Sequence, residues 1–417
     1  MSNLRYLARS LAFLPPILLL AGALGVVSCG KSLYSTSSSG SASPTSTSTA
    51  TGGGFGYVTN VGSGYITEFK RTILTGALKY NARIAAGATS GTNGPKGIAI
   101  TSNNAFLYAS NTKDGNIYQY TVGSDGTLTP MTPPSVPNGV NSSPEQLVTL
   151  SSSGTPTWLL VSNYGAGTIS AYPITSSGPL GTAVTSNILG MSGPFGLAIN
   201  STGTILYVSD NAHGTIYALA FNSTSGALTN ITAGLPTSPV PSQGGTFGSP
   251  GFLALGPVIS GGTSPGAYLL VGDTNPANQV VSLFFIANSG NGVPGYLTYA
   301  VPVSFAAIGV AWAGSTIALS ANQNTGATAS GSITSYILNG SALSTSSNVL
   351  SVNGPTTIIV DSQNAFAYST NQGNGTIGQY QLNTTCGGAT QTICSVRAIA
   401  SDPKISNPGP FGIVLTN

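Results

Sequence analysis

The tetrapeptide Tyr57-Val58-Thr59-Asn60 recurs in altered form along most of this 417-residue chain. Six further copies follow it, and the first residues of successive copies are 47 to 63 positions apart. In chain order these copies are Tyr108–Asn111, Leu160–Asn163, Tyr207–Asp210, Leu270–Asp273, Ala318–Ala321 and Tyr368–Asn371. A repeat of this length, built from short β-prone runs, is typical of the blades of a β-propeller. The sequence therefore predicts seven blades.

Each copy lies between two other short apolar runs. After most copies come a turn and a Gly-x-Ile run, such as Gly64–Ile66, and the Gly- and Asn-rich turns favour hairpins because these residues accept positive φ. Before each copy lies a run that is apolar on both faces, such as Gly97–Ile100, which suits an innermost strand. We therefore expect an all-β, seven-bladed propeller of four-stranded antiparallel blades. Because the repeats begin with the tetrapeptide strand Phe55–Asn60 and end with the inner-strand run Phe411–Asn417, the C-terminal strand should join the first blade and close the ring.

The N-terminal segment is typical of an export signal. Arg5 and Arg9 precede the apolar stretch Leu11–Val27, and residues 1–28 are predicted to be a signal peptide of the lipoprotein type. Val26-Val27-Ser28-Cys29 resembles a bacterial lipobox, after which the cysteine carries lipid. The alternatives are a signal anchor or an unmodified cleavage site. Residues 29–54 are rich in Ser, Thr and Gly and predict a disordered tether, which leaves 55–417 for the propeller.

These features predict where the protein resides. We expect it to be exported and lipid-anchored in the bacterial cell envelope or at the cell surface. Gly30 stands where an acidic residue would favour retention in the inner membrane, so the outer membrane is favoured. The membrane, through the N-terminal lipid, is therefore a predicted partner.

The composition restricts the classes of function. Charged residues make up 5 % of the chain, far below the roughly 25 % that is usual. Loss of Arg5 and Arg9 with the signal lowers the eleven Lys and Arg residues to nine, against eight acidic residues. This near-neutral balance offers no basic surface for nucleic acid, which we do not expect as a partner. We expect a monomer without a cofactor.

With Cys29 assigned to the lipid, Cys386 and Cys394 remain. Two nearby thiols in an exported protein usually pair, so we predict a disulfide that braces the last hairpin before the closing strand. A metal site is the alternative, but His, Asp and Glu are absent from the neighbouring sequence, and no metal is predicted.

Candidate site residues gather on one predicted face. Connections that enter inner strands and turns that follow the tetrapeptides should emerge together, around the mouth of the central channel. Two of the longest insertions, Thr129–Pro144 and Asn230–Pro250, are connections of the first kind, and long loops on rigid scaffolds often carry binding surfaces. We predict that ligand binding on this face involves Lys96, Lys113, Asp114, Glu145, His213 and Lys404.

Glu145 and His213 are the candidate catalytic residues. Glu145 directly precedes an inner strand, so its carboxylate could act as a base or a ligand at the channel mouth, or as a hydrogen-bonded structural group. His213 could act as a general base or as a polar turn residue. Asp210 and Asp273 take the place that Asn holds in four other copies, so we expect their side chains to bond turn amides. No nucleophile elbow or phosphate loop is present.

The tetrapeptides Tyr57–Asn60 and Tyr207–Asp210, with the Gly-Pro-Phe-Gly runs at 193–197 and 409–413, resemble the YVTN-type propellers. That group is placed with the seven-bladed 6-phosphogluconolactonase and muconate-lactonising-enzyme family, and the resemblance spans residues 55–417. It implies a propeller and, in characterised members, cytoplasmic enzymes with His, Glu and Arg at the channel mouth. No motif of this sequence matches the His, Glu and Arg residues of those enzymes. The mature chain has one His and only three Arg, which are Arg71, Arg83 and Arg397. A phosphosugar would require converging cations, which are not evident.

Three hypotheses about function follow. The first is an extracytoplasmic binding or interaction module, non-catalytic, that holds a ligand or protein partner through its long-loop face. The second is a lactonase-type hydrolase acting on a lactone or sugar lactone, with Glu145 and His213 as the nearest acid–base groups. The third is a structural protein of the envelope. Only the resemblance supports the enzyme.

Overall fold

The computed structural model describes residues 53–89, 93–231, 240–241, 248–259, 266–275, 280–287, 294–302, 306–323, 330–339, 342–383, 392–404 and 408–416. The predicted signal peptide, the tether up to residue 52 and Cys29 lie outside these residues, and so does Cys386. Cys394 falls in a strand, but its side chain is not described. The lipid anchor and the disulfide therefore stay predictions. None of the described segments is a helix with the length and apolar character that crossing a bilayer demands.

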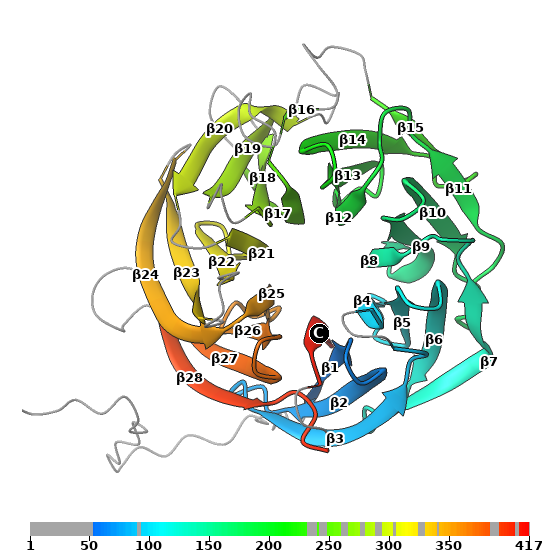
Figure 1. The fold of residues 1–417 in the computed structure, drawn as a ribbon, viewed down its shortest axis with the longest axis horizontal. Coiled ribbons are helices and arrows are strands. Elements are labelled where there is room, and N and C mark those ends of the chain that lie inside the picture. Colours follow the sequence, from blue (N-terminus) through cyan, green and yellow to red (C-terminus); the bar gives the residue numbers. More distant parts are fainter. Residues whose placement is uncertain are drawn as a thin grey trace, which may run out of the picture. The chain divides into compact units, whose positions relative to one another are not determined.

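The described strands form seven antiparallel sheets (Figure 1). From the channel outward, blade 1 consists of β29 (Pro410–Leu415), β1 (Gly54–Asn60), β2 (Tyr65–Arg71) and β3 (Leu78–Ala85). Blade 2 consists of β4 (Pro95–Ile100), β5 (Phe106–Asn111), β6 (Asn116–Val122) and β7 (Leu128–Pro137). Blade 3 consists of β8 (Pro144–Ser152), β9 (Thr155–Asn163), β10 (Thr168–Pro173) and β11 (Val184–Asn187).

The remaining blades follow the same plan. Blade 4 consists of β12 (Pro194–Ile199), β13 (Ile205–Asp210), β14 (Thr215–Phe221), β15 (Leu228–Asn230) and the short β16 (Val240–Pro241), which also pairs with β14. Blade 5 consists of β17 (Pro250–Ile259), β18 (Gly266–Asp273), β19 (Val280–Ala287) and β20 (Pro294–Pro302). Blade 6 consists of β21 (Ala306–Ala313), β22 (Ile317–Gln323), β23 (Ser330–Asn339) and β24 (Ala342–Asn353). Blade 7 consists of β25 (Pro355–Val360), β26 (Phe366–Asn371), β27 (Thr376–Asn383) and β28 (Thr392–Ala400).

The C-terminal strand closes the ring, which confirms the predicted fold. β29 pairs with β1 and so brings the end of the chain into the first blade, as Figure 1 shows. Each inner strand contacts the inner strand of the next blade, in the order β29, β4, β8, β12, β17, β21, β25 and back to β29. Buried apolar side chains fill the spaces between adjacent sheets. The channel is therefore surrounded by seven inner strands that share one direction.

The third position of the tetrapeptide joins neighbouring blades. The Ser110 hydroxyl accepts a hydrogen bond from Gly97 N in its own blade (2.9 Å) and donates one to Glu145 O in the next blade (3.0 Å). The same pair of bonds is made by Thr59, Ser162, Ser209 and Thr370. A β-bulge at the start of each inner strand brings the strand close enough for these bonds. Gly97 fits there because an added Cβ would clash with the Glu145 carbonyl oxygen.

The tyrosine at the first position has a related role. Tyr57 donates to Gly126 O (3.0 Å), and Tyr108 donates to Gly178 O (2.6 Å), in the outer hairpin of the next blade. Both glycines have positive φ, at 82° and 105°, which a larger residue rarely adopts. The tetrapeptide recurs because it holds adjacent blades together, so its repetition indicates the fold and not the chemistry.

Two details of the predicted pattern were wrong. In blade 6, Asn322 and not Ala321 aligns with the last tetrapeptide position, because Ala321 pairs with Ile333 as Thr59 pairs with Ile66. The sixth copy is therefore Leu319–Asn322, one residue later than expected.

The insertion Thr129–Pro144 is not one long loop, since β7 extends to Pro137 and the connection to β8 is residues 138–143. Most of Asn230–Pro250 lies outside the described residues.

Candidate functional site

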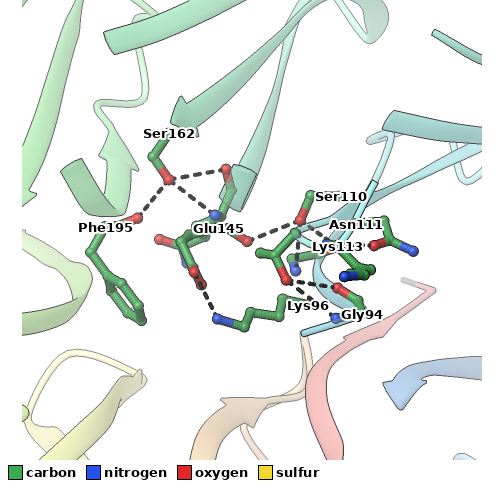
Figure 2. A network of polar contacts seen from close by, with 11 residues as sticks. Gly94, Lys96, Ser110, Asn111, Lys113, Glu145, Ser162 and Phe195 are labelled. Atoms are coloured by element: carbon green, nitrogen blue, oxygen red, sulfur yellow. Dashed lines mark hydrogen bonds and ion pairs between the residues drawn. The ribbon is translucent and has the colours of Figure 1, made fainter. Parts of the chain in front are cut away.

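Lys96 and Glu145 meet at the mouth of the channel (Figure 2). Lys96 follows the first residue of β4 in blade 2, and Glu145 follows the first residue of β8 in blade 3. Their side chains point toward one another, and Lys96 Nζ lies 2.7 Å from Glu145 Oε1. The exposed fractions of the side chains are 17 % and 9 %. Two of the predicted ligand-binding residues, 49 positions apart in the chain, thus form one ion pair.

The backbone beneath this pair is held by the interblade hydroxyls. Thr59 donates to Lys96 O (2.6 Å), and Ser110 donates to Glu145 O (3.0 Å). Gln146, the next residue of β8, accepts a hydrogen bond from Leu197 N in blade 4. Blades 1 to 4 therefore fix the strand ends that carry the pair, and the pair rests on a rigid part of the ring.

A cavity of about 400 Å³ opens beside the pair, and Lys96 and Gln146 form part of its wall. Phe252 and Phe411, from the starts of other inner strands, also form part of the wall, and Phe195 packs against Phe252. The Phe252 ring is 5.2 Å from Phe195 and 6.1 Å from Phe411, measured between centroids. Lys96 Nζ lies 5.5 Å from the centroid of Phe411, within range of a cation–π contact. The mouth therefore combines one compensated charge pair with an apolar surface.

Glu145 differs from most other buried acids of the chain. Six of the eight acidic residues are buried, and four of these, Asp210, Asp273, Asp361 and Asp402, accept hydrogen bonds from backbone amides. Only Glu68 and Glu145 keep a buried carboxylate oxygen without a hydrogen-bond partner among the described residues. Burial raises the pKa of Glu145, and the nearby Lys96 charge and hydrogen bond oppose this rise. Such a carboxyl group can exchange a proton closer to neutral pH.

The structure places the other predicted residues apart from this pair. Lys113 and Asp114 are exposed in the β5–β6 turn and line a separate pocket of about 490 Å³ formed with residues 137–143. His213 Nδ1 lies 3.0 Å from Asp210 Oδ2, and the His213 side chain is 53 % exposed. Lys404 is exposed, and its backbone amide donates to Asp402. No described contact joins these residues to Lys96 or Glu145, so their roles stay predictions.

Asp210 and Asp273 bond loop amides, as the tetrapeptide alignment predicted. Asp210 accepts from Ser192 N (3.1 Å) and Gly193 N (2.9 Å), and Asp273 accepts from Ser249 N (3.2 Å) and Asn275 N (2.8 Å).

The described residues contain no group of three His, Cys, Asp or Glu side chains arranged to hold a metal ion.

Sequence reasoning missed the residues that complete the mouth. These are Gln146, Phe195, Phe252 and Phe411, none of which was named from the sequence as a candidate site residue. A signal was present, because Lys96, Glu145, Phe195 and Phe411 each directly follow the proline that begins an inner strand. In a closed ring of repeats, equivalent positions of the blades lie at the same end of the central channel.

Comparison with known proteins gives a family match for part of the chain. Residues 53–195 match the family model described as "Lactonase, 7-bladed beta-propeller", and this range includes Lys96 and Glu145. No curated protein matches the sequence.

Several solved structures resemble the chain over most of its length. A candidate 6-phosphogluconolactonase from Bacteroides fragilis shares 15 % identity, with 89 % of this chain and 100 % of that chain covered and a TM-score of 0.66. A second, from Bacteroides uniformis, shares 13 % identity over 87 % and 99 % of the two chains, with a TM-score of 0.65. A periplasmic gluconolactonase of Pseudomonas aeruginosa shares 14 % identity over 88 % and 99 %, with a TM-score of 0.57. At these identities the likeness concerns the fold.

Proposed function

From the premise that the chain is a lactonase-like seven-bladed β-propeller, we propose that it hydrolyses a lactone at the Lys96–Glu145 pair. The partial family match covers both residues and favours this hypothesis over the non-catalytic binding module, which was the first hypothesis from the sequence. The observation that carries the proposal is the state of Glu145. This carboxyl group is buried beside a cavity, lies 2.7 Å from an ammonium group, and leaves one oxygen without a partner among the described residues.

The pair suits a substrate without net charge. One carboxylate and one ammonium compensate each other, so neither sign dominates the mouth. A phosphate group would need further cations, but Arg71 is paired with Asp361 (3.0 Å) and Arg83 with Asp402 (3.2 Å). The side chain of Arg397 is not described. We therefore propose an unphosphorylated lactone.

In the proposed reaction, Lys96 Nζ donates a hydrogen bond to the lactone carbonyl oxygen. An ammonium group has three protons, so Lys96 can keep its bond to Glu145 while it does so. Glu145 accepts a proton from a water molecule, and the water oxygen attacks the carbonyl carbon. The ammonium group then stabilises the negative charge that develops on the carbonyl oxygen. When the ring C–O bond breaks, Glu145 returns the proton to the leaving oxygen, which yields a hydroxy acid.

The decisive experiment compares two glutamates. Glu145→Gln keeps the shape of the side chain and removes the base, so kcat for a simple γ- or δ-lactone should fall about 100-fold. Glu68→Gln is the matched control, because Glu68 also has a buried oxygen without a partner among the described residues but does not line either of the two channel cavities. Its kcat should stay within about twofold of wild type. Spontaneous hydrolysis is subtracted in each assay. Equal rates for all three proteins would refute the proposal.

Ligand binding without turnover is the second candidate function. It is favoured by one specific observation, that Glu145 Oε2 is buried and Glu145 is not part of the described cavity wall, whereas Lys96 and Gln146 are. Under this alternative, lactones would bind but wild-type protein would not open them. Calorimetric titration with a lactone, run beside the hydrolysis assay, separates the two functions.

We also propose that this chemistry takes place outside the cytoplasm, on a protein held to the membrane by lipid at Cys29. The support is the sequence of residues 1–29 alone. Labelling of cells with a radioactive fatty acid should mark the wild-type protein and not Cys29→Ser. Equal labelling of both would contradict the anchor.

A further inference from the structure

The channel below the charged mouth is lined mostly by apolar side chains. The cavity beside Lys96 shares Ile98, Ile359, Val360, Ile413 and Val414 with a second cavity of about 300 Å³, so the two adjoin along the channel. The wall also includes Leu255 and Trp312. Lys96 and Gln146 stand only at the end where the inner strands begin.

Most other polar side chains of this wall are bonded to neighbouring backbone, and Ser362, at the far end, is exposed. Trp312 Nε1 donates to Ala254 O (3.1 Å), Thr357 Oγ1 donates to Phe411 O (2.7 Å), and Thr149 Oγ1 donates to Ile100 O (2.9 Å). These bonds satisfy the side chain and also a carbonyl group of an inner strand. At the far end, Asp361 is bonded to Arg71 and to two backbone amides. A ligand with many hydroxyl groups would therefore lose hydrogen bonds to water and find few side-chain partners in their place here.

On these grounds, and resting on the proposed function, we propose that the substrate is a lactone with an alkyl substituent. Its ring binds at the Lys96 ammonium group, beside the rings of Phe252 and Phe411, and its alkyl chain extends down the channel against Ile359, Val360 and Val414. The same wall disfavours a sugar lactone, whose hydroxyl groups would face these methyl groups.

Trp312 allows occupancy to be measured without turnover. The chain has two tryptophans, and Trp158 lies elsewhere, buried in blade 3 with Nε1 bonded to Ser223 O (2.9 Å). Trp158→Phe therefore leaves Trp312 as the single indole, in the cavity wall. The probes are 5-alkyl-2-pyrrolidinones, lactams that share the ring of a γ-lactone but resist hydrolysis, with methyl, propyl and pentyl chains.

The fluorescence titration should give a Kd that falls about fourfold for each added methylene, as expected for burial of an alkyl chain. Gluconolactam, the polyhydroxylated counterpart, should bind more weakly than the pentyl lactam. Val414→Phe, which narrows the channel, should abolish the dependence on chain length, whereas Leu189→Phe, at a residue that is 95 % exposed, should not. If the melting temperature of Val414→Phe falls markedly, Val360→Phe replaces it.

A Kd independent of chain length, or tighter binding of gluconolactam, would overturn this inference even if lactones are hydrolysed. Loss of hydrolysis with the chain-length dependence intact would overturn the proposed reaction and leave the channel as an alkyl-binding site.

Discussion

Two of the ion pairs that join neighbouring blades of this propeller, Arg71–Asp361 and Lys96–Glu145, lie in different surroundings. Arg71 in blade 1 and Asp361, directly after β25 in blade 7, are 3.0 Å apart, with side chains that are 2 % and 0 % exposed. Lys96 in blade 2 and Glu145 in blade 3 are 2.7 Å apart, and Lys96 faces a cavity.

The two carboxylates differ in the hydrogen bonds that they accept. Asp361 Oδ1 accepts from Ala365 N (2.8 Å) and Phe366 N (3.1 Å), while Oδ2 accepts from Arg71. Among the described residues, Glu145 accepts one side-chain bond, from Lys96, and its Oε2 accepts none. A fully bonded carboxylate holds structure in place, whereas one with an unused oxygen beside a cavity can act on a ligand. In a chain with so few charges, an unused carboxylate oxygen together with a neighbouring cavity separates a candidate site from structural acids better than burial does.

The largest expected effect concerns the structural pair. Arg71→Met leaves Asp361 buried without its cation and should lower the free energy of unfolding by about 3–5 kcal/mol. Lys96→Met should lower it by only about 1–2 kcal/mol, because Glu145, whose pKa burial raises, can take up a proton when its cation is lost. Denaturant unfolding of both variants measures these values. A larger loss of unfolding free energy in Lys96→Met than in Arg71→Met would show that Lys96–Glu145 is the more structural of the two pairs.

The next effect concerns Glu68, the other acid with an unused oxygen. Burial, together with the charge of Asp125, raises the pKa of Glu68 to about 7, although a hydrogen bond from the Leu128 backbone opposes the rise. Because the folded protein holds this proton more tightly than the unfolded chain, the stabilisation is complete below the ordinary glutamate pKa and is lost as pH rises through about 7.

The free energy of unfolding should therefore fall by about 2 kcal/mol between pH 5 and pH 8. Glu68→Gln should remove most of this slope without changing lactone hydrolysis. The contrast between the two glutamates is contradicted if the free energy of unfolding of Glu68→Gln still falls with pH as it does in the wild type. It is also contradicted if kcat for lactone hydrolysis falls in Glu68→Gln as far as is expected for Glu145→Gln.

The smallest effect concerns the hydroxyl beneath the site. Ser110→Ala removes bonds to Gly97 N and Glu145 O and should cost about 1 kcal/mol of stability. Ser209→Ala is the matched control, since Ser209 makes the same two bonds in blade 4 without supporting the pair. Both variants should be destabilised alike, but only Ser110→Ala should also slow lactone hydrolysis severalfold. Equal rates for the two variants would show that Ser110 does not position Glu145.

The sequence predicted the ring well because the tetrapeptide residues bond neighbouring blades, so every blade repeats them. It failed in blade 6, where Leu319 replaces the tyrosine and two small residues follow, so apolar alternation alone cannot fix the register. The bonds of Asn322 to Ser332 and Thr334 identify the correct alignment. Lys96 and Glu145 were predicted on one face, but their pairing was not, because it depends on the bulge that aligns β4 and β8.

The pH dependence of lactone hydrolysis tests the role of Glu145 most directly. Glu145 must be deprotonated to accept a proton from water, and burial raises its pKa. The kcat of the wild-type protein, after subtraction of spontaneous hydrolysis, should therefore rise with pH through a midpoint above the ordinary glutamate value. In Glu145→Gln this rise should disappear together with most of the rate. A rise of the same midpoint and height in both proteins would contradict the assignment of Glu145 as the base.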